Sequence, residues 1–123
     1  MTRLSFALLL TASVAIAADP LPTAIDCYQT STRAKDLDAY MACFTRDAEM
    51  IDVTRRFTGH NAIRRWAQRE VIPSGDSFKH RKILESDAGY AKTEVKWSAW
   101  VVHYSYWWNQ DGKITRMSLQ YAD

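Results

Sequence analysis

Asp52 is the residue of this sequence whose position most needs a chemical explanation. It belongs to the segment AEMIDV, residues 48–53, where Met50, Ile51 and Val53 are the apolar neighbours expected of a β-strand. Burying an unpaired carboxylate is costly, or it forces the group to bind a proton. Such a carboxylate is suited to accept a proton from a ligand, whereas a structural carboxylate accepts hydrogen bonds from the protein. Both interpretations are open from the sequence.

A later aromatic segment provides further candidates for a ligand site that includes Asp52. The even positions of residues 100–108 are Trp100, Val102, Tyr104, Tyr106 and Trp108. A period of two predicts that this set faces the interior of a sheet. A structural place in the core is the simpler explanation for the two tryptophans. Each buried tyrosine hydroxyl needs a hydrogen-bond partner, so the tyrosines indicate polar groups within an apolar pocket.

The elements that must position these side chains can be predicted from periodicity and turn residues. Helices are expected at residues 25–34, 37–44 and 61–71, and strands at 49–53, 79–85, 90–97, 100–108 and 114–121. No turn residues separate the strands at 90–97 and 100–108, so either residues 96–99 bend tightly or this assignment is wrong. Helices followed by a run of strands predict one α+β domain, with three N-terminal helices packed on an antiparallel sheet.

The first 17 residues resemble a secretory signal peptide. A short basic start is followed by an apolar run from Leu4 and by Ala15-Ile16-Ala17, a small-x-small cleavage site. The alternative, a membrane anchor, needs about 20 apolar residues, and Asp19 and Pro20 end this run too early. We therefore expect the domain to comprise residues 18–123, to be periplasmic or secreted, and to have no membrane contact after cleavage.

Two cysteines in an exported chain indicate a disulfide. Cys27 and Cys43 lie eight residues before and after Lys35, on two helices predicted to form an antiparallel hairpin. This symmetry places them at the same height, about 12 Å from the turn at 1.5 Å per residue. Two buried free thiols are the alternative.

Charge and motif content exclude several classes of function. The chain has 16 basic and 14 acidic residues, which is too balanced for a dedicated nucleic-acid binder. The arginines between residues 55 and 69 are expected to form a solvated face. His60, His80, His103 and Asp52 lack the short spacing of a metal site. Phosphate-binding and dinucleotide motifs are absent, so no metal and no cofactor is expected.

Several motifs together resemble one superfamily. They are Lys35-Asp36-Leu37-Asp38, the segment from Cys43 to Asp52, the segment from Gly59 to Arg64, and Asp111-Gly112-Lys113-Ile114. Their order and spacing resemble the nuclear transport factor 2-like superfamily, in its SnoaL-like and ketosteroid isomerase-like branches. The resemblance implies a cystatin-like cone, in which a curved sheet encloses a deep cavity against the helices. It also implies a homodimer formed through the outer face of the sheet.

The resemblance to ketosteroid isomerases implies roles for individual residues. Asp52 matches their general base, Tyr28 matches an oxyanion-binding tyrosine, and Tyr104 matches the second oxyanion donor. Phenols keep their proton at neutral pH, so both tyrosines are able to donate. The residues expected to contact the substrate are Trp66, His80, Tyr106, Trp108 and Tyr121.

These residues support three expectations about function. The first is proton transfer next to the carbonyl of a small apolar or aromatic compound, as in an isomerase. The second is a dehydration or hydration in which His80 and Asp52 act through water, which the resemblance of His80 to the cavity histidine of scytalone dehydratase-like and related SnoaL-like proteins implies. The third is a non-catalytic module that binds a small ligand or a protein in the same cone.

Overall fold

The structure of the protein, a computed structural model, describes residues 20–123; the predicted signal peptide lies outside the described residues. In chain order the elements are α1 (Thr23–Arg33), α2 (Leu37–Met41), β1 (Phe44–Asp52), β2 (Arg55–Thr58), α3 (His60–Glu70), the 3₁₀ segment η1 (Ile72–Ser77), β3 (Phe78–Asp87), β4 (Tyr90–Trp97), β5 (Trp100–Trp108) and β6 (Ile114–Tyr121). The predicted α+β class is confirmed.

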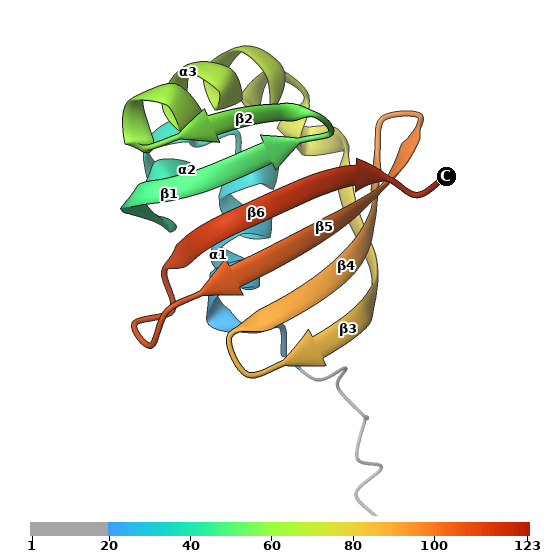
Figure 1. Cartoon of the computed structure of the whole chain (residues 1–123). Helices are drawn as coiled ribbons and strands as arrows, with labels where there is room; N and C mark the ends of the chain where they lie inside the picture. Colours follow the sequence, from blue (N-terminus) through green and yellow to red (C-terminus); the bar gives the residue numbers. More distant parts are fainter. Residues whose placement is uncertain (1–19) are drawn as a thin grey trace, which may run out of the picture.

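The six strands form one curved sheet in the order β2-β1-β6-β5-β4-β3. Figure 1 shows that the sheet bends around α1 and α2, while α3 lies along the edge formed by β2 and β1. All neighbours are antiparallel except β1 and β6, which are parallel. The sheet is therefore antiparallel as expected apart from this one pair, which the sequence did not predict. Because β1 and β6 are parallel, their carboxyl ends lie at the same end of the sheet.

The second helix and the first strand differ from the sequence expectation. The helix ends at Met41 rather than at Phe44, and β1 begins at Phe44 rather than at Glu49. The Cys43 carbonyl accepts a bond from the Ile114 N–H at 2.8 Å, which starts the pairing with β6. Tyr40, Met41 and Phe44 are all buried. Their spacing fits one face of a longer helix, but it fits a short helix followed by a strand equally well, so the sequence pattern did not reveal where the helix ends.

The two-residue turn Ser98-Ala99 connects β4 to β5. Trp97 and Trp100 are paired across it, and Ser98 has a φ of 53°. A tight bend within residues 96–99 is therefore confirmed. The strand β2, by contrast, was not predicted, because three of its four residues are exposed and it lacks an apolar alternation.

The core lies between α1 and the concave face of the sheet. Tyr28 is buried at the centre of an aromatic cluster and packs against Tyr40, Phe44, Phe78, Tyr104 and Tyr106, with ring centroids 4.9 to 6.2 Å apart. Such aromatic pairs stabilise a core beyond the area that they bury. The inward face predicted for β5 is therefore confirmed for Val102, Tyr104 and Tyr106.

Trp100 is not part of this core. It is on the predicted face of β5, but 59% of its surface is exposed, and its ring packs on Tyr121 at 5.4 Å. Along β5 the core begins at Val102, so Trp100, at the start of the strand, is left uncovered. The expectation that Trp100 is a core residue was therefore wrong, whereas Trp108 is half-buried against the core.

A disulfide joins Cys27 of α1 to Cys43, with the Cα atoms 5.9 Å apart. Cys43 follows the short helix α2 and lies directly before β1. The bond therefore ties α1 to the start of the sheet, and the predicted pairing is confirmed.

Candidate ligand pocket

A pocket of about 560 Å³ lies at the end of the sheet where β1 and β6 terminate, and we call it the end pocket. Figure 1 shows the carboxyl ends of β1 and β6 and the β4–β5 turn together at this end of the molecule. The lining residues are Asp52, Val53, Thr54, Arg55, Trp66, Glu70, Ser74, Trp97, Ser98, Trp100, Val102, Leu119, Gln120 and Tyr121. This volume is in the usual range for small-molecule sites.

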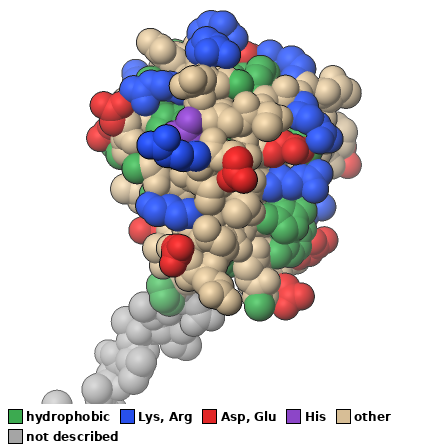
Figure 2. Space-filling view, turned by 60° about the vertical axis from the view of Figure 1, so that its left-hand side comes forward, with side chains coloured by type: hydrophobic (Ala, Val, Ile, Leu, Met, Phe, Trp, Pro, Cys, Tyr) green, Lys and Arg blue, Asp and Glu red, His purple; other side chains and the backbone are tan. Residues whose placement is uncertain are grey.

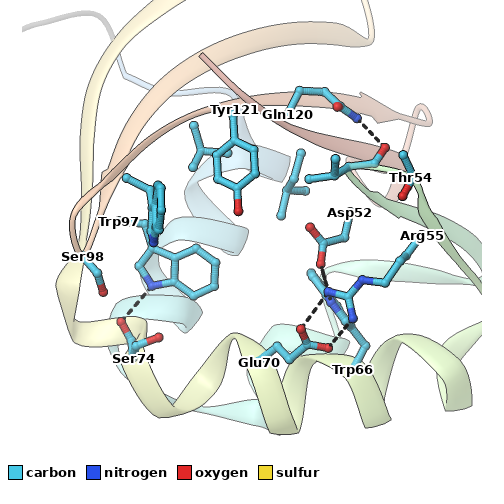
Figure 3. A pocket seen from close by; sticks show the side chains of 14 residues that line it. Asp52, Thr54, Arg55, Trp66, Glu70, Ser74, Trp97, Ser98, Gln120 and Tyr121 are labelled. Atoms are coloured by element: carbon cyan, nitrogen blue, oxygen red, sulfur yellow. Dashed lines mark hydrogen bonds and ion pairs between the residues drawn. The ribbon is translucent and has the colours of Figure 1, made fainter. Parts of the chain in front are cut away.

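One side of the end pocket is aromatic and apolar. Figure 3 shows the Trp97 and Tyr121 side chains directed into the space, opposite Asp52. The Trp97 indole is held in place because its Nε1–H donates to the Ser74 carbonyl at 3.0 Å. Trp100 and Tyr121, which are both exposed, form the rim. This wall offers flat apolar surfaces to a ligand at low entropic cost.

The other side of the end pocket is charged. Asp52, whose side chain is 20% exposed, accepts a hydrogen bond on Oδ2 from Trp66 Nε1–H at 3.1 Å and a second on the same oxygen from Arg55 Nη2. Figure 3 shows the second carboxylate oxygen directed into the pocket, away from these donors. No residue between 20 and 123 donates a hydrogen bond to that oxygen, Oδ1. One oxygen of Asp52 is thus structural and the other is available to a ligand.

Arg55 is held between two carboxylates. Its Nη1 and Nη2 donate to Glu70 at 2.9 and 2.7 Å, in addition to the bond with Asp52. These bonds from Arg55 lower the pKa of Glu70, whereas its burial opposes the shift. A bidentate pair fixes the plane of the guanidinium, so its hydrogen-bonding groups point at the protein rather than at the pocket.

The turn between β1 and β2 places this charged group. Asp52 and Arg55 are paired across the two-residue turn Val53-Thr54, and Val53 has a φ of 59°. A β-branched residue in this region is strained. The Val53 N–H donates to the Leu119 carbonyl and its own carbonyl accepts from the Gln120 amide, at 2.9 and 3.1 Å. These bonds to β6 hold the strained turn in place, and the turn positions Asp52 and Arg55 at the pocket.

The structure brings together some of the predicted site residues and separates others. Asp52, Trp66 and Tyr121 line the end pocket. Tyr28, Tyr104 and Tyr106 are fully buried in the aromatic core instead. The Tyr28 hydroxyl accepts a hydrogen bond from Tyr40 at 3.2 Å, so its partner is another phenol. The predicted convergence of Asp52 with two phenols in one open cavity is therefore not what the structure contains, because packed rings fill the inner part of the cone.

Burial raises the pKa of Tyr28 well above its usual value of 10, and the nearby Tyr40 and Tyr106 add to the effect. Burial likewise raises the pKa of Tyr104, with a smaller contribution from the neighbouring phenols and Asp52. Both phenols thus stay protonated at neutral pH.

His80 and Trp108 lie away from the end pocket. The Gln29 amide nitrogen is 3.0 Å from His80 Nδ1, between α1 and β3. Trp108 instead lines a separate hollow beside the start of α1, together with Thr23, Ala24 and the turn at residues 109–112. A joint action of His80 with Asp52 therefore has no support from their positions.

His80 is expected to make stability depend on pH. Burial, together with the positive charge of Arg33, lowers the pKa of His80 below its usual 6.5. The unfolded chain then binds a proton that the folded protein resists, so the free energy of unfolding decreases as the pH falls below about 6.5. Urea unfolding between about pH 7.5 and pH 5 measures this decrease. The His80→Gln variant should lose it, and equal slopes in both proteins would contradict this assignment.

Sequence reasoning missed Arg55, Glu70, Trp97 and Trp100 as pocket residues. A signal was available for three of them, and none for Trp97. Arg55 follows Asp52 by three residues, the spacing of a two-residue turn, and Glu70 follows Trp66 by one helical turn. Trp100 shares a face of β5 with Val102, which lines the same pocket.

The predicted arginine-rich face consists largely of ion pairs. Arg56 pairs with Glu49, and Arg64 pairs with Asp38 from the adjacent helix. Figure 2 shows one face of the molecule, on which basic and acidic side chains are interspersed rather than gathered by sign. Within residues 20–123, no cluster of three potential metal ligands occurs and no helix is long and apolar enough to span a membrane.

Comparisons with known proteins identify the fold. No protein-family model matches the chain, and no curated protein does. Among solved structures, it is similar to a putative polyketide cyclase from Sinorhizobium meliloti, with 25% identity, a TM-score of 0.68, and coverage of 81% of this chain and 95% of that one. A SnoaL-like protein of unknown function from Burkholderia thailandensis has 14% identity and a TM-score of 0.70, with coverage of 80% and 92%.

A third similar structure is a computationally designed 17-OHP binder, with 14% identity, a TM-score of 0.66, and coverage of 80% of this chain and 87% of that one. NTF-2-like and cystatin-like proteins from other bacteria match to the same degree. The element order, the curved sheet and these similarities agree, and the chain has the fold of the nuclear transport factor 2-like superfamily.

Proposed function

We propose that the protein binds a small, mostly apolar or aromatic molecule in the end pocket. The observation that carries this proposal is an aromatic wall opposite a carboxylate oxygen to which no residue from 20 to 123 donates a hydrogen bond, within about 560 Å³. An apolar site with a few placed polar groups is the usual form of a small-molecule site. The designed 17-OHP binder supports it, because a protein of similar fold was made to hold a small ligand.

A thermal-shift screen with steroids, terpenoids and aromatic ketones tests this proposal. A ligand that binds only the folded protein stabilises it by about 2.7 kcal/mol at a hundredfold excess over its Kd. Trp100→Ala removes part of the exposed wall and should weaken a hit about tenfold without unfolding the protein. Trp107→Ala, on the outer face of β5, is the matched control. Equal affinities for both variants and the parent would contradict the proposal.

The second candidate function is proton transfer, and the free oxygen of Asp52 is the observation that favours it. A general base must reach the proton that it removes, and Oδ1 is directed into the pocket. In this proposal Tyr28 and Tyr104 are the oxyanion donors. Both lie in the aromatic core beyond the pocket lining, so a ligand reaches their hydroxyl groups only if the core opens. An assay with a β,γ-unsaturated ketone tests it: Asp52→Asn should abolish isomerisation and Tyr28→Phe should slow it. Activity at the parent level in both variants would eliminate this candidate.

Export and self-association complete the proposal. The disulfide between Cys27 and Cys43 supports an oxidising compartment, the periplasm or the exterior, as the signal-like residues 1–17 predict. A homodimer through the outer face of the sheet stays a prediction of the family resemblance. Trp107 lies on that face, with Tyr90 and Arg116 packed on its ring. Fractionation of expressing cells tests the first point, and sedimentation of the purified protein tests the second.

A further inference from the structure

The charges that line the end pocket do not cancel. Among the lining residues Asp52 and Glu70 are acidic, whereas Arg55 is basic. Arg55 is bonded to both carboxylates, so the group carries one net negative charge at neutral pH. Arg69 is close enough to Glu70 to lower its pKa, but it is not part of the lining. A ligand in the pocket therefore meets an excess of negative charge.

The rim adds to the same electrostatic environment. A second hollow of about 430 Å³ shares Trp100 and Tyr121 with the end pocket, and Asp123 is one of its lining residues. The faces of aromatic rings attract cations, and this attraction adds to that of a nearby carboxylate. Trp97, Trp100 and Tyr121 thus provide a surface suited to a cationic group as well as to an apolar body.

The hydrogen-bonding groups in the lining point to the same ligand chemistry. The free Oδ1 of Asp52 is an acceptor and needs a donor from the ligand. An acidic ligand would have to compete with Glu70 for Arg55, whose bonds to Glu70 are bidentate. A neutral ketone has no donor to offer to Asp52. A primary ammonium group satisfies both the charge and the acceptor. A quaternary ammonium group has no N–H to donate, so it satisfies the charge alone and packs on the aromatic wall.

We propose that the end pocket selects organic cations, namely amines or quaternary ammonium compounds with an aromatic or alkyl body, with the cationic group between Asp52 and the aromatic wall. This inference rests on the proposed function, since it names the class of ligand for the same pocket. The negative charge of the Asp52–Arg55–Glu70 group supplies the selectivity, and the tryptophans supply most of the contact area.

A series of compounds that share one phenylpropyl body tests the selectivity. The probes are 3-phenylpropylamine, its trimethylammonium analogue, 3-phenylpropanol, 4-phenylbutan-2-one and 3-phenylpropanoate, each titrated by calorimetry and tryptophan fluorescence. We expect both cations to bind about tenfold more tightly than the alcohol and the ketone, and the carboxylate to bind weakest. Added salt should weaken the cations and leave the neutral probes nearly unchanged.

Asp52→Asn provides the matched variant. The asparagine oxygen still accepts from Trp66, while the pocket loses its net charge, so the preference for cations should disappear and the neutral probes should bind as before. Asp111→Asn, an exposed acidic residue in the β5–β6 turn, should leave the preference unchanged. The series on the unaltered protein decides the question even if Asp52→Asn folds poorly.

The outcomes separate this inference from the proposed function. If the alcohol and the ketone bind as tightly as the cations, the inference is overturned while the pocket remains a ligand site. If no probe binds and the steroid, terpenoid and ketone screen is also negative, the proposed function fails with it.

Discussion

Gly75→Ala is expected to lower the free energy of unfolding by about 3 kcal/mol or more. An added Cβ at this position would lie 2.0 Å from the carbonyl oxygen of Thr32 and 3.0 Å from its carbonyl carbon. Both are backbone atoms, and this oxygen accepts the Lys35 N–H at 3.0 Å in the turn that ends α1. Neither partner is able to move away as a flexible side chain would. The substitution therefore separates η1 from α1 and disturbs the side of the end pocket that contains Ser74.

Thermal and urea unfolding measure this effect, and a loss of this size should lower Tm by more than about 10 °C. Asp76→Ala is the matched control, because Asp76 is the next residue and its side chain is exposed. It should change stability by less than about 0.5 kcal/mol. Equal Tm values for the two variants would contradict the close packing of η1 against α1.

Loss of the Cys27–Cys43 disulfide is expected to cost about 3 kcal/mol. The bond joins two residues with a sequence separation of 16. Cross-linking a loop of this length lowers the entropy of the unfolded chain, which stabilises the folded protein by roughly 3 kcal/mol. Tyr40 and Phe44, the neighbours of Cys43, are buried in the core, so we expect their contacts to hold the local structure when the bond is absent. The loss should therefore appear as lower stability of the same fold rather than as a different fold.

Two preparations measure the disulfide effect independently. The double variant Cys27→Ala, Cys43→Ala lacks the bond permanently, and the parent protein in reductant loses it reversibly. Both should unfold at a similarly reduced urea concentration, while mass spectrometry should find a two-proton increase on reduction of the parent alone. Unchanged unfolding of the parent in reductant would contradict the stabilising role of the bond.

Much of the fold was predictable because its strands have clear periodicity. The alternation of β5 correctly placed Val102, Tyr104 and Tyr106 inward, and the spacing around Lys35 predicted the disulfide. The motifs resembling the nuclear transport factor 2-like superfamily predicted the same architecture that the similar structures support. Local pattern and global topology agreed in these segments, as expected of a sequence with one stable fold.

The predicted site was less accurate, because a sequence pattern gives the face of a side chain but not what covers it. Tyr104 and Tyr121 are both on inward faces, yet one is buried and the other is exposed at the rim. How far the helices extend over the sheet decides between these outcomes. The packing of Tyr28 with its aromatic neighbours fills the inner cone, so the open space begins only beyond Val102.

The pairing of Asp52 with Arg55 and Trp66 explains why this carboxylate is tolerated at the end of the partly buried strand β1. It is neither unpaired nor fully enclosed, since one oxygen is bonded by the protein and the other reaches the pocket. The sequence left open whether Asp52 is a structural or a functional group. In the structure Oδ2 has the structural role, because it accepts hydrogen bonds from the protein, and Oδ1 is placed for the functional one, because it is directed into the pocket.

Indole N–H chemical shifts provide the most direct measurement of the central claim that the end pocket is the ligand site. The protein has five tryptophans, of which Trp66, Trp97 and Trp100 line the pocket. Titration of ¹⁵N-labelled protein with the tightest-binding probe should shift the signals of these three and leave Trp107, on the outer face, unchanged. Saturable shifts confined to Trp107 or Trp108, with none at Trp97 and Trp100, would contradict the claim.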